Sequence, residues 1–454
     1  MSPRIRLIIL SLCAVLFFTA TPYIILYSLG YRIDFAKMKI TATGGIYVKA
    51  LPEGTEVVID FKMNNKTGIL SNAVFVQNLF PEQHNVLIKK EGYHDYKKNL
   101  TVKKNQVIKL ENVILFKKNI NFNLFEDQVD KFFISPDGKK LFFLKYLNAE
   151  KSKKTDVGIV NLENQKKQFF AFSPVNGEIS NIQWSNDSNK VLFYKENSYF
   201  LLEPFGLKPE ITNLLFLNDA KKVSFNPQNN NQFFFIKNKN LYADTQNLPI
   251  VKNVIDYQIT NQEINWLSDD GFLYHTDLSG KIRDKISSSG IPVKKNSFYK
   301  ISIFSGQIFL EEDQSLYLFN QDSKIFENFY RPVTSFKISP AGEKILYCNN
   351  NEVSYHFFEQ NDLKKILSQN TLQEISDCSW LNDDYLIFIS GNNIIISETD
   401  TRDNTNKIKL PDSLSLPNGE NINIKKPHLI FNQRDKKLYI LTQKNLFVSE
   451  RLTP

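Results

Sequence analysis

The side chains that could carry chemistry are few in this chain, and they stand far apart. None of the five histidines lies at a metal-ligand spacing from another histidine or from a cysteine, which argues against a zinc site. The sequence also lacks a Gly-x-Ser-x-Gly nucleophile elbow, a His-Glu-x-x-His motif, a P-loop and a glycine-rich dinucleotide motif. We therefore predict no catalytic, cofactor-binding or metal-binding residue. The histidines are His84, His94, His275, His356 and His428.

Two acidic segments come nearest to a calcium site. They are Asp269-Asp270-Gly271 and Asp137-Gly138, but a calcium loop needs oxygen ligands at alternating positions, which neither segment has. We interpret both as turns. Carboxylates from separate loops could still meet in the folded chain, so an enzyme that acts on glycans or peptides is the alternative to a non-enzymatic function.

The three cysteines are too few for a disulfide framework. Cys13 lies in an apolar run, and Cys348 and Cys378 fall in later strand patterns. We expect all three to be buried free thiols that pack as small apolar side chains.

The composition is that of a folded protein rich in strands. The 454 residues suggest about three domains, and the 42% of apolar residues can form real cores. Aromatic residues make up 13% of the chain, with 37 Phe and 19 Tyr, which favours strands. The net charge of +8 is a mild basic excess, so its location matters more than its sum.

The elements that must position any site begin with an apolar segment at residues 7–29. The segment carries no charge and is flanked by arginines, and about 20 residues are enough to span a bilayer core. Tyr23, Tyr27 and Tyr31 near its distal end fit an interfacial aromatic belt. We predict an uncleaved membrane-spanning helix between a cytoplasmic tail at residues 1–6 and a linker at residues 30–43. A cleaved signal peptide and a buried soluble helix are the alternatives, but the small-residue cleavage site is poor.

The orientation of this helix is predicted from its flanks. Arg4, Arg6 and the α-amino group favour a cytoplasmic N-terminus, although Arg32 and two lysines after the segment oppose it. Long domains translocate regardless of flanking charge, and a short N-terminal tail stays inside. We therefore place residues 31–454 on the extracytoplasmic side of the cell membrane.

Residues 44–116 show short alternating patterns separated by turns. A turn at residues 52–55 precedes a strand signal at residues 57–60, and two further strands flank the turn Lys103-Lys104-Asn105. We predict a small antiparallel β-sandwich.

The same segment resembles the PEGA domain family. Its turn Pro52-Glu53-Gly54-Thr55 nearly spells the family's name, and the other family positions follow in order. These positions are Gly45, Pro52, Gly54, Asp60, Leu79, His84 and Gly92-Tyr93. Two turn glycines of the family are replaced here, by Phe61 and by Glu82. The resemblance implies an extracytoplasmic β-module that serves placement and interaction rather than chemistry.

Basic charge collects in residues 1–118, which hold 17 Lys and Arg against 8 Asp and Glu, whereas residues 119–454 are close to neutral. One interpretation of the paired lysines is contact with anionic lipids or wall polymers, and the other is protection of strand edges from pairing with other chains. No interleaving of basic and aromatic residues indicates nucleic-acid binding, so we predict no nucleic-acid partner. The pairs are Lys89-Lys90, Lys97-Lys98, Lys103-Lys104 and Lys117-Lys118.

A repeated pattern fills residues 117–454. Each copy has a large apolar residue, a turn rich in Ser, Asn, Pro, Asp and Gly, and then an apolar strand, as in FFISPDGKKLFFL from Phe132. The turns lie near residues 135, 185, 226, 268, 305, 339, 381 and 432, a mean spacing of about 42 residues. This period, with about four strands per unit, indicates a β-propeller. Trp184, Trp266 and Trp380 precede their turns, where we expect them to fill the space between sheets.

The repeats resemble the TolB-like and WD-repeat propeller families, and the SPDGKKLFFL string matches the TolB-like type. The last copy ends one strand short, and a strand within residues 116–125 would complete it and close the ring. We predict eight blades, with seven as the alternative. The predicted fold class is all-β, a small antiparallel sandwich followed by a seven- or eight-bladed propeller, with one N-terminal transmembrane helix.

These elements together predict a membrane-anchored, extracytoplasmic binding or scaffold protein. Its partners would be the membrane, through a single-pass anchor, and a protein or cell-envelope polymer at the propeller. No cofactor is expected.

Overall fold

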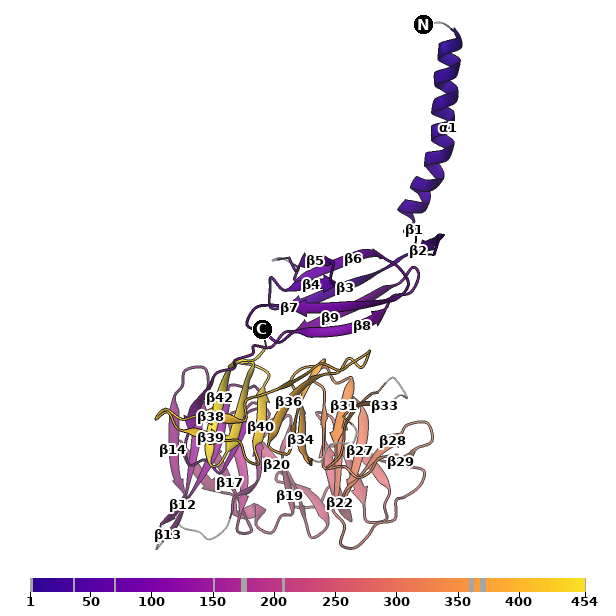
Figure 1. The fold of residues 1–454 in the computed structure, drawn as a ribbon. Coiled ribbons are helices and arrows are strands. Elements are labelled where there is room, and N and C mark those ends of the chain that lie inside the picture. Colours follow the sequence, from indigo (N-terminus) through magenta and orange to yellow (C-terminus); the bar gives the residue numbers. More distant parts are fainter. Residues whose placement is uncertain are drawn as a thin grey trace. The chain divides into compact units, whose positions relative to one another are not determined.

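The computed structural model describes residues 3–35, 37–68, 71–149, 152–172, 178–205, 209–358, 363–367 and 373–453. The chain divides into two compact units (Figure 1). The first comprises Met1–Ile120, Ser397–Ile408 and Leu452–Pro454, and the second comprises Asn121–Ile396 and Lys409–Arg451. Strands make up nearly all of the regular structure, which confirms the all-β fold class.

The first unit begins with helix α1, Pro3–Ser28. Its 26 residues extend about 39 Å at 1.5 Å per residue, enough to cross a bilayer core of about 30 Å. No residue of the helix is buried, and Pro22 lies inside it, where membrane helices tolerate proline. The chain therefore has one helix, among its described residues, that is long and apolar enough to span a membrane. A short hairpin follows it, formed by β1 (Tyr31–Asp34) and β2 (Lys39–Ala42).

A sandwich of two sheets comes next in this unit. One sheet has the order β6-β3-β9 and the other β5-β4-β7-β8, with a single core that includes Ile46, Val57 and Val86. The predicted sandwich is confirmed, although β3 and β9 pair in parallel while the other neighbours are antiparallel. The strands are β3 (Gly44–Leu51), β4 (Glu56–Ile59), β5 (Met63–Lys66), β6 (Ala73–Leu79), β7 (Gln83–Lys89), β8 (Tyr96–Thr101) and β9 (Val107–Ile114).

The sandwich brings Asp60 and His84 together. His84 Nδ1 lies 2.6 Å from Asp60 Oδ2, and its Nε2 lies 2.8 Å from the carbonyl oxygen of Phe80. The second oxygen of Asp60 accepts the backbone N–H of Asn85 at 2.9 Å. Asp60 and Phe61 have φ values of +52° and +59°, so this turn takes the left-handed conformation that favours glycine at the position of Phe61. The buried imidazole thus joins the turn to β7, which is a structural role.

Eight antiparallel sheets follow in the described part of the chain, and we number them as blades in chain order (Figure 1). Seven have four strands and blade 3 has three. Blade 1 comprises β11 (Lys131–Ile134), β12 (Lys140–Ala149), β13 (Ser152–Asn161) and β14 (Lys167–Phe172), and blade 2 comprises β15 (Ser180–Trp184), β16 (Val191–Lys195), β17 (Ser198–Glu203) and β18 (Glu210–Asn213). Blade 3 comprises β19 (Lys222–Asn226), β20 (Asn229–Lys237) and β21 (Asn240–Ala243). Blade 4 comprises β22 (Val254–Ile259), β23 (Glu263–Ser268), β24 (Leu273–Asp277) and β25 (Arg283–Lys285). Blade 5 comprises β26 (Tyr299–Phe304), β27 (Gln307–Glu312), β28 (Ser315–Asn320) and β29 (Ile325–Tyr330), and blade 6 comprises β30 (Ser335–Ile338), β31 (Lys344–Cys348), β32 (Val353–Phe357) and β33 (Leu363–Leu367). Blade 7 comprises β34 (Ile375–Trp380), β35 (Tyr385–Ser390), β36 (Asn393–Glu398) and β37 (Lys407–Lys409). Blade 8 comprises β40 (His428–Asn432), β41 (Lys437–Thr442) and β42 (Asn445–Arg451) together with β10 (Phe122–Glu126). A separate hairpin is formed by β38 (Ser413–Ser415) and β39 (Asn421–Asn423), and one 3-10 turn lies at Leu215–Leu217.

The ring of blades is closed by its two ends. β10 pairs antiparallel with β42, so blade 8 contains strands from both ends of the repeat array. This confirms the closure that was predicted because the last repeat is one strand short. Apolar clusters lie between neighbouring blades: Phe142 of blade 1 packs with Phe193 of blade 2, and Phe132 of blade 1 packs with Tyr439 of blade 8. Each blade therefore buries its two faces against the neighbouring blades, which explains why the blades form a ring.

The three tryptophans fill space between neighbouring blades, as predicted. Trp184 and Trp380 end the first strands of blades 2 and 7. Trp266 instead lies on β23, the second strand of blade 4, and stacks on Tyr274 with 4.6 Å between ring centroids. The turn near residue 268 therefore joins second and third strands. The sequence pattern misassigned this copy because the blade's own first turn, at residues 260–262, has neither proline nor glycine.

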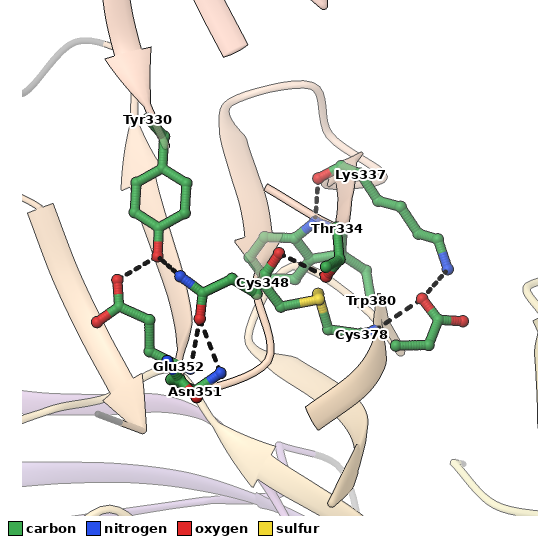
Figure 2. The surroundings of a disulfide bond; sticks show 10 residues. Tyr330, Thr334, Lys337, Cys348, Asn351, Glu352, Cys378 and Trp380 are labelled. Carbon is green, nitrogen blue, oxygen red and sulfur yellow. Dashed lines mark hydrogen bonds and ion pairs between the residues drawn. A yellow bond between two sulfur atoms is a disulfide. The ribbon is translucent and has the colours of Figure 1, made fainter. Parts of the chain in front are cut away.

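The structure corrects the expectation of three buried free thiols. Cys348 on β31 and Cys378 on β34 form a disulfide that joins blades 6 and 7, with Cα atoms 6.3 Å apart (Figure 2). The two lie 30 residues apart because the repeat packs the second strand of one blade against the first strand of the next. Nearby, Trp380 Nε1 donates to the carbonyl oxygen of Lys337 at 2.9 Å. Cys13 is a free thiol, but it is exposed on α1.

A recurring pair of residues organises the turns between first and second strands. Ser135 Oγ accepts the backbone N–H of Lys140 at 2.9 Å, and Ser185 Oγ accepts that of Lys190 at 2.9 Å. The lysine side chain then reaches the next blade, as Lys140 Nζ donates to the carbonyl oxygen of Ser188 at 2.8 Å. The same pair recurs at Ser339 and Lys344. These turns therefore link successive blades as well as reversing the chain.

Candidate functional site

A cavity of about 810 Å³ lies among the first strands of blades 2 to 5, and we call it the channel cavity. Most of its lining residues lie on or beside β15, β19, β22 and β26, and Tyr199 of β17 and Ile236 of β20 complete the lining. First strands face the axis of a propeller, so residues separated by one repeat converge there. Pockets of this size accommodate small molecules or a short segment of a polymer.

A buried ion pair lies on one wall of the channel cavity. Lys222 Nζ is 2.7 Å from Asp256 Oδ1 and also donates to the carbonyl oxygen of Tyr257 at 2.5 Å. Asp256 Oδ2 accepts the backbone N–H of Ile301 at 2.7 Å. Burial raises the pKa of Asp256, and the ammonium of Lys222 opposes that rise. Both oxygens of the carboxylate are thus used to hold β19, β22 and β26 together.

Lys300, which also lines the cavity, is paired as well, whereas Lys221 lines it with an exposed side chain. Lys300 Nζ lies 3.0 Å from Glu311 Oε1. The hydroxyl of Tyr299 donates to Glu312 Oε1 at 2.9 Å, and Lys294 Nζ lies 2.8 Å from the same carboxylate. These contacts position the wall of the cavity.

Uncharged groups remain to meet a ligand. Gln183 and Gln258 line the cavity and provide amide donors and acceptors. Phe298 lines the same cavity and is 57% exposed, so an aromatic ring faces solvent there. The arrangement favours binding through hydrogen bonds and apolar contact.

A second group of charged residues lies on the first strands of blades 6 to 8. Lys337 Nζ is 3.4 Å from Asp377 Oδ1, and His428 packs edge-on against Phe132 with 5.3 Å between ring centroids. Desolvation lowers the pKa of His428, an effect that Asp377 opposes and Lys337 reinforces. The imidazole of His428 therefore lies within electrostatic range of this ion pair.

The acidic segments that resembled calcium ligands are turns, as predicted. Gly138 and Gly271 have φ values of +69° and +83° at their tips. Among the residues that the structure describes, no three His, Cys, Asp or Glu side chains are grouped to hold a metal ion.

The lysine pairs of the first unit do not form one uniform surface. Lys98 is buried, with its Nζ 2.7 Å from Glu398 Oε1 and bonded to the carbonyl oxygens of Asp400 and Asn404 at 2.8 and 2.7 Å. Its neighbour Lys97 is exposed. Lys98 is therefore excluded from both interpretations of the pairs, because it neither faces lipid nor protects an open strand edge.

Sequence reasoning missed the channel cavity. Lys222 and Asp256 are 34 residues apart and meet only when blades 3 and 4 pack together. The serine and lysine pairs of the blade turns were detectable, because Ser135, Ser185 and Ser339 are each followed five residues later by lysine.

The comparison with known families bears on the sandwich. Residues 43–115 match the PEGA domain family. No relative is found among curated protein sequences.

Solved structures similar to the chain are propeller-like but distant. Virginiamycin B lyase from Staphylococcus aureus is 12% identical over 74% of this chain and 99% of that chain, with a TM-score of 0.42. Hsv2 from Kluyveromyces lactis is 11% identical over 63% and 98%, with a TM-score of 0.40. Sqt1 from Chaetomium thermophilum is 6% identical over 74% and 99%, with a TM-score of 0.48. Likenesses this distant carry no argument about function.

Proposed function

We propose that this chain is a membrane-anchored, extracytoplasmic binding or scaffold protein whose propeller recognises a protein or a cell-envelope polymer at the channel cavity. The observation that carries the proposal is the lining of the cavity. Its ion pairs Lys222–Asp256 and Lys300–Glu311 are made within the protein, whereas Gln183, Gln258 and Phe298 are left to contact a ligand. Such a lining suits a polymer segment with polar groups and apolar faces.

Three observations support the extracytoplasmic placement. Helix α1 is long and apolar enough to span a membrane, the sandwich matches the PEGA domain family, and Cys348 and Cys378 are joined. Disulfides persist in oxidising compartments and are rare in the cytosol. The SPDGKKLFFL string that begins at Ser135 further supports a TolB-like type of propeller.

Photo-crosslinking in intact cells tests the binding site. A benzophenone amino acid replaces Phe298 at the cavity or Ile282, which is 61% exposed on blade 4 but does not line the cavity. We expect covalent adducts from position 298 and none from position 282. Absence of adducts at both positions, or equal adducts at both, would contradict recognition at the channel cavity.

Protease treatment of intact cells tests the placement. Residues 31–454 should be degraded while the α1 segment stays in the membrane fraction. Protection of the propeller would overturn the outward orientation.

An enzyme that acts on glycans or peptides is the second candidate, and His428 beside the Lys337–Asp377 pair is the observation that favours it. A neutral imidazole near a carboxylate can act as a general base. Incubation of the purified chain with envelope glycans and peptides, compared with His428→Gln, tests it. Turnover that the substitution abolishes would establish the enzyme.

A further inference from the structure

The hairpin β1–β2 presents an apolar face immediately after helix α1. Ile33 and Ile40 are direct cross-strand partners, so their side chains share one face of the hairpin. Phe35 and Met38 stand at its tip and are 78% and 83% exposed. Large apolar side chains gathered on an ordered element mark an interaction surface.

The opposite face of the hairpin holds it in place. Asp34 and Thr41 are buried there, and Asp34 Oδ1 accepts the backbone N–H of Lys37 at 3.0 Å. At the base, the carbonyl oxygen of Gly30 accepts both the backbone N–H and the hydroxyl of Thr43, at 2.9 and 2.6 Å. Ile33 and Ile40 are therefore held outward, while Ala42 at the base of the same face is buried.

The position of the hairpin in the chain identifies what covers this face. Only Leu29 and Gly30 separate α1 from β1, so the hairpin begins within roughly 10 Å of the helix end. The headgroup region on each side of a bilayer core is about 5–7 Å thick. A hairpin this close to the end of a spanning helix has to lie at the membrane surface.

The polar residues around the hairpin suit the same location. The guanidinium of Arg32 stacks on the ring of Tyr27 with its central carbon 3.5 Å from the ring centroid. Tyrosine and arginine favour the headgroup region, where the ring meets the acyl boundary and the charge meets phosphate. Lys39 is exposed on β2 and adds a second positive charge for anionic headgroups.

We propose that the β1–β2 hairpin inserts Phe35, Met38 and Ile40 into the outer interface of the bilayer. The first unit then attaches to the membrane at two places, the spanning helix and the hairpin. This inference rests on the proposed membrane anchor, and it adds a contact that the anchor alone does not require.

Tryptophan quenching in vesicles tests the inference with the full chain. The protein is reconstituted into phosphatidylcholine–phosphatidylglycerol vesicles whose phosphatidylcholine carries bromine on its acyl chains. Phe35→Trp reports on the hairpin, Leu16→Trp reports on the helix, and Leu248→Trp is a control on blade 3 with a similar exposed fraction, 77%. The emission of the three native tryptophans is measured on the unsubstituted chain and subtracted.

We expect the added emission at position 35 to fall by roughly half, as for a side chain at the headgroup and acyl boundary, and position 248 to stay unquenched. Met38→Trp provides a second reporter on the same surface. Quenching at position 16 without quenching at positions 35 and 38 would overturn the hairpin contact and leave the anchor standing. Equal quenching at positions 35 and 248 would also overturn a contact specific to the hairpin. Absence of quenching at position 16 would overturn the anchor and the hairpin contact together.

Discussion

The β-sandwich and the β-propeller bury their strands in different ways. The two sheets of the sandwich share one core, in which Ile46 and Val86 take part. Each propeller blade instead packs on both sides, as blade 2 does through Phe193 toward blade 1 and Tyr199 toward blade 3. A local change in the sandwich therefore acts on one cooperative core, whereas the propeller depends on the links between successive sheets.

The turns of the two regions show the same contrast. The β4–β5 turn of the sandwich holds Phe61 at a φ of +59° with its side chain 80% exposed, so it carries backbone strain with little packing in return. The corresponding position is glycine in the turns of blades 1 and 6, at Gly138 and Gly342, and Ser188 in the turn of blade 2, with a φ of +59°. In these turns a serine such as Ser135 bonds the turn internally. The propeller turns thus contribute to the stability of neighbouring blades, and the sandwich turn costs stability.

Removal of the disulfide should have the largest effect. We expect Cys348→Ala with Cys378→Ala to lower the free energy of unfolding of the propeller by about 3–4 kcal/mol, because the crosslink closes a loop of 30 residues. The three tryptophans all lie in blades, so their fluorescence during denaturation reports the propeller alone. Hydrogen exchange of residues 44–114 reports the sandwich, which should be unchanged. A loss of protection in the sandwich of equal size would contradict the separation of the two regions.

Alkylation of the protein as isolated from cells provides the matching chemical control. In denaturant without a reducing agent, only Cys13 should react. After reduction in the same denaturant, Cys348 and Cys378 should react as well.

A blade turn should be sensitive to the loss of its serine. Ser185 is buried, its hydroxyl donates to Asp187 Oδ1 at 2.6 Å, and it accepts the backbone N–H of Lys190 at 2.9 Å. Ser185→Ala leaves these groups without a partner, which costs about 1–3 kcal/mol. Ser180→Ala, at an exposed position on the first strand of the same blade, is the control. Equal shifts of the denaturation midpoint for the two variants would rule out a special role for the turn.

The sandwich turn should respond in the opposite direction. Phe61→Gly relieves the left-handed strain and is expected to raise the stability of the sandwich by about 1 kcal/mol. Phe61→Ala removes the same ring but keeps a Cβ, so it should change the stability little. Hydrogen exchange of amides in β4 and β7 measures both. A gain of the same size from alanine would show that the exposed ring, rather than the backbone, is the source of the cost.

The propeller is built from repeats, and this repetition both stabilises it and made it predictable from the sequence. Turn signals such as those at Ser135 and Ser339 recur at one period, and the missing last strand indicated closure by β10. Contacts between repeats were not predictable, because spacing along the chain does not say which strands face each other. The Cys348–Cys378 bond and the Lys222–Asp256 pair belong to this class. The parallel pairing of β3 and β9 in the sandwich was not predictable for the same reason.

The smallest expected effect concerns a blade turn that depends on charge. Asp277 Oδ1 accepts the backbone N–H of Ile282 at 2.9 Å, and Oδ2 accepts the hydroxyl of Ser279. These hydrogen bonds, that of Ser279 first, lower the pKa of Asp277 from 3.8 to about 2. A carboxyl whose pKa is lower in the folded state stabilises the fold above its unfolded pKa, and that stabilisation is lost as the pH falls toward about 2.

Asp277→Asn should therefore lower the stability of the propeller at neutral pH. The difference from the unsubstituted chain should shrink as the pH falls from about 4 to about 2, because the parent carboxyl becomes protonated over that interval. Denaturation followed by tryptophan fluorescence at several pH values measures the difference. A difference that stays constant across the interval would mean that the turn depends on the shape of the side chain and not on its charge. This turn would then be held by neutral hydrogen bonds, and its contrast with the strained turn at Phe61 would lie in the backbone alone.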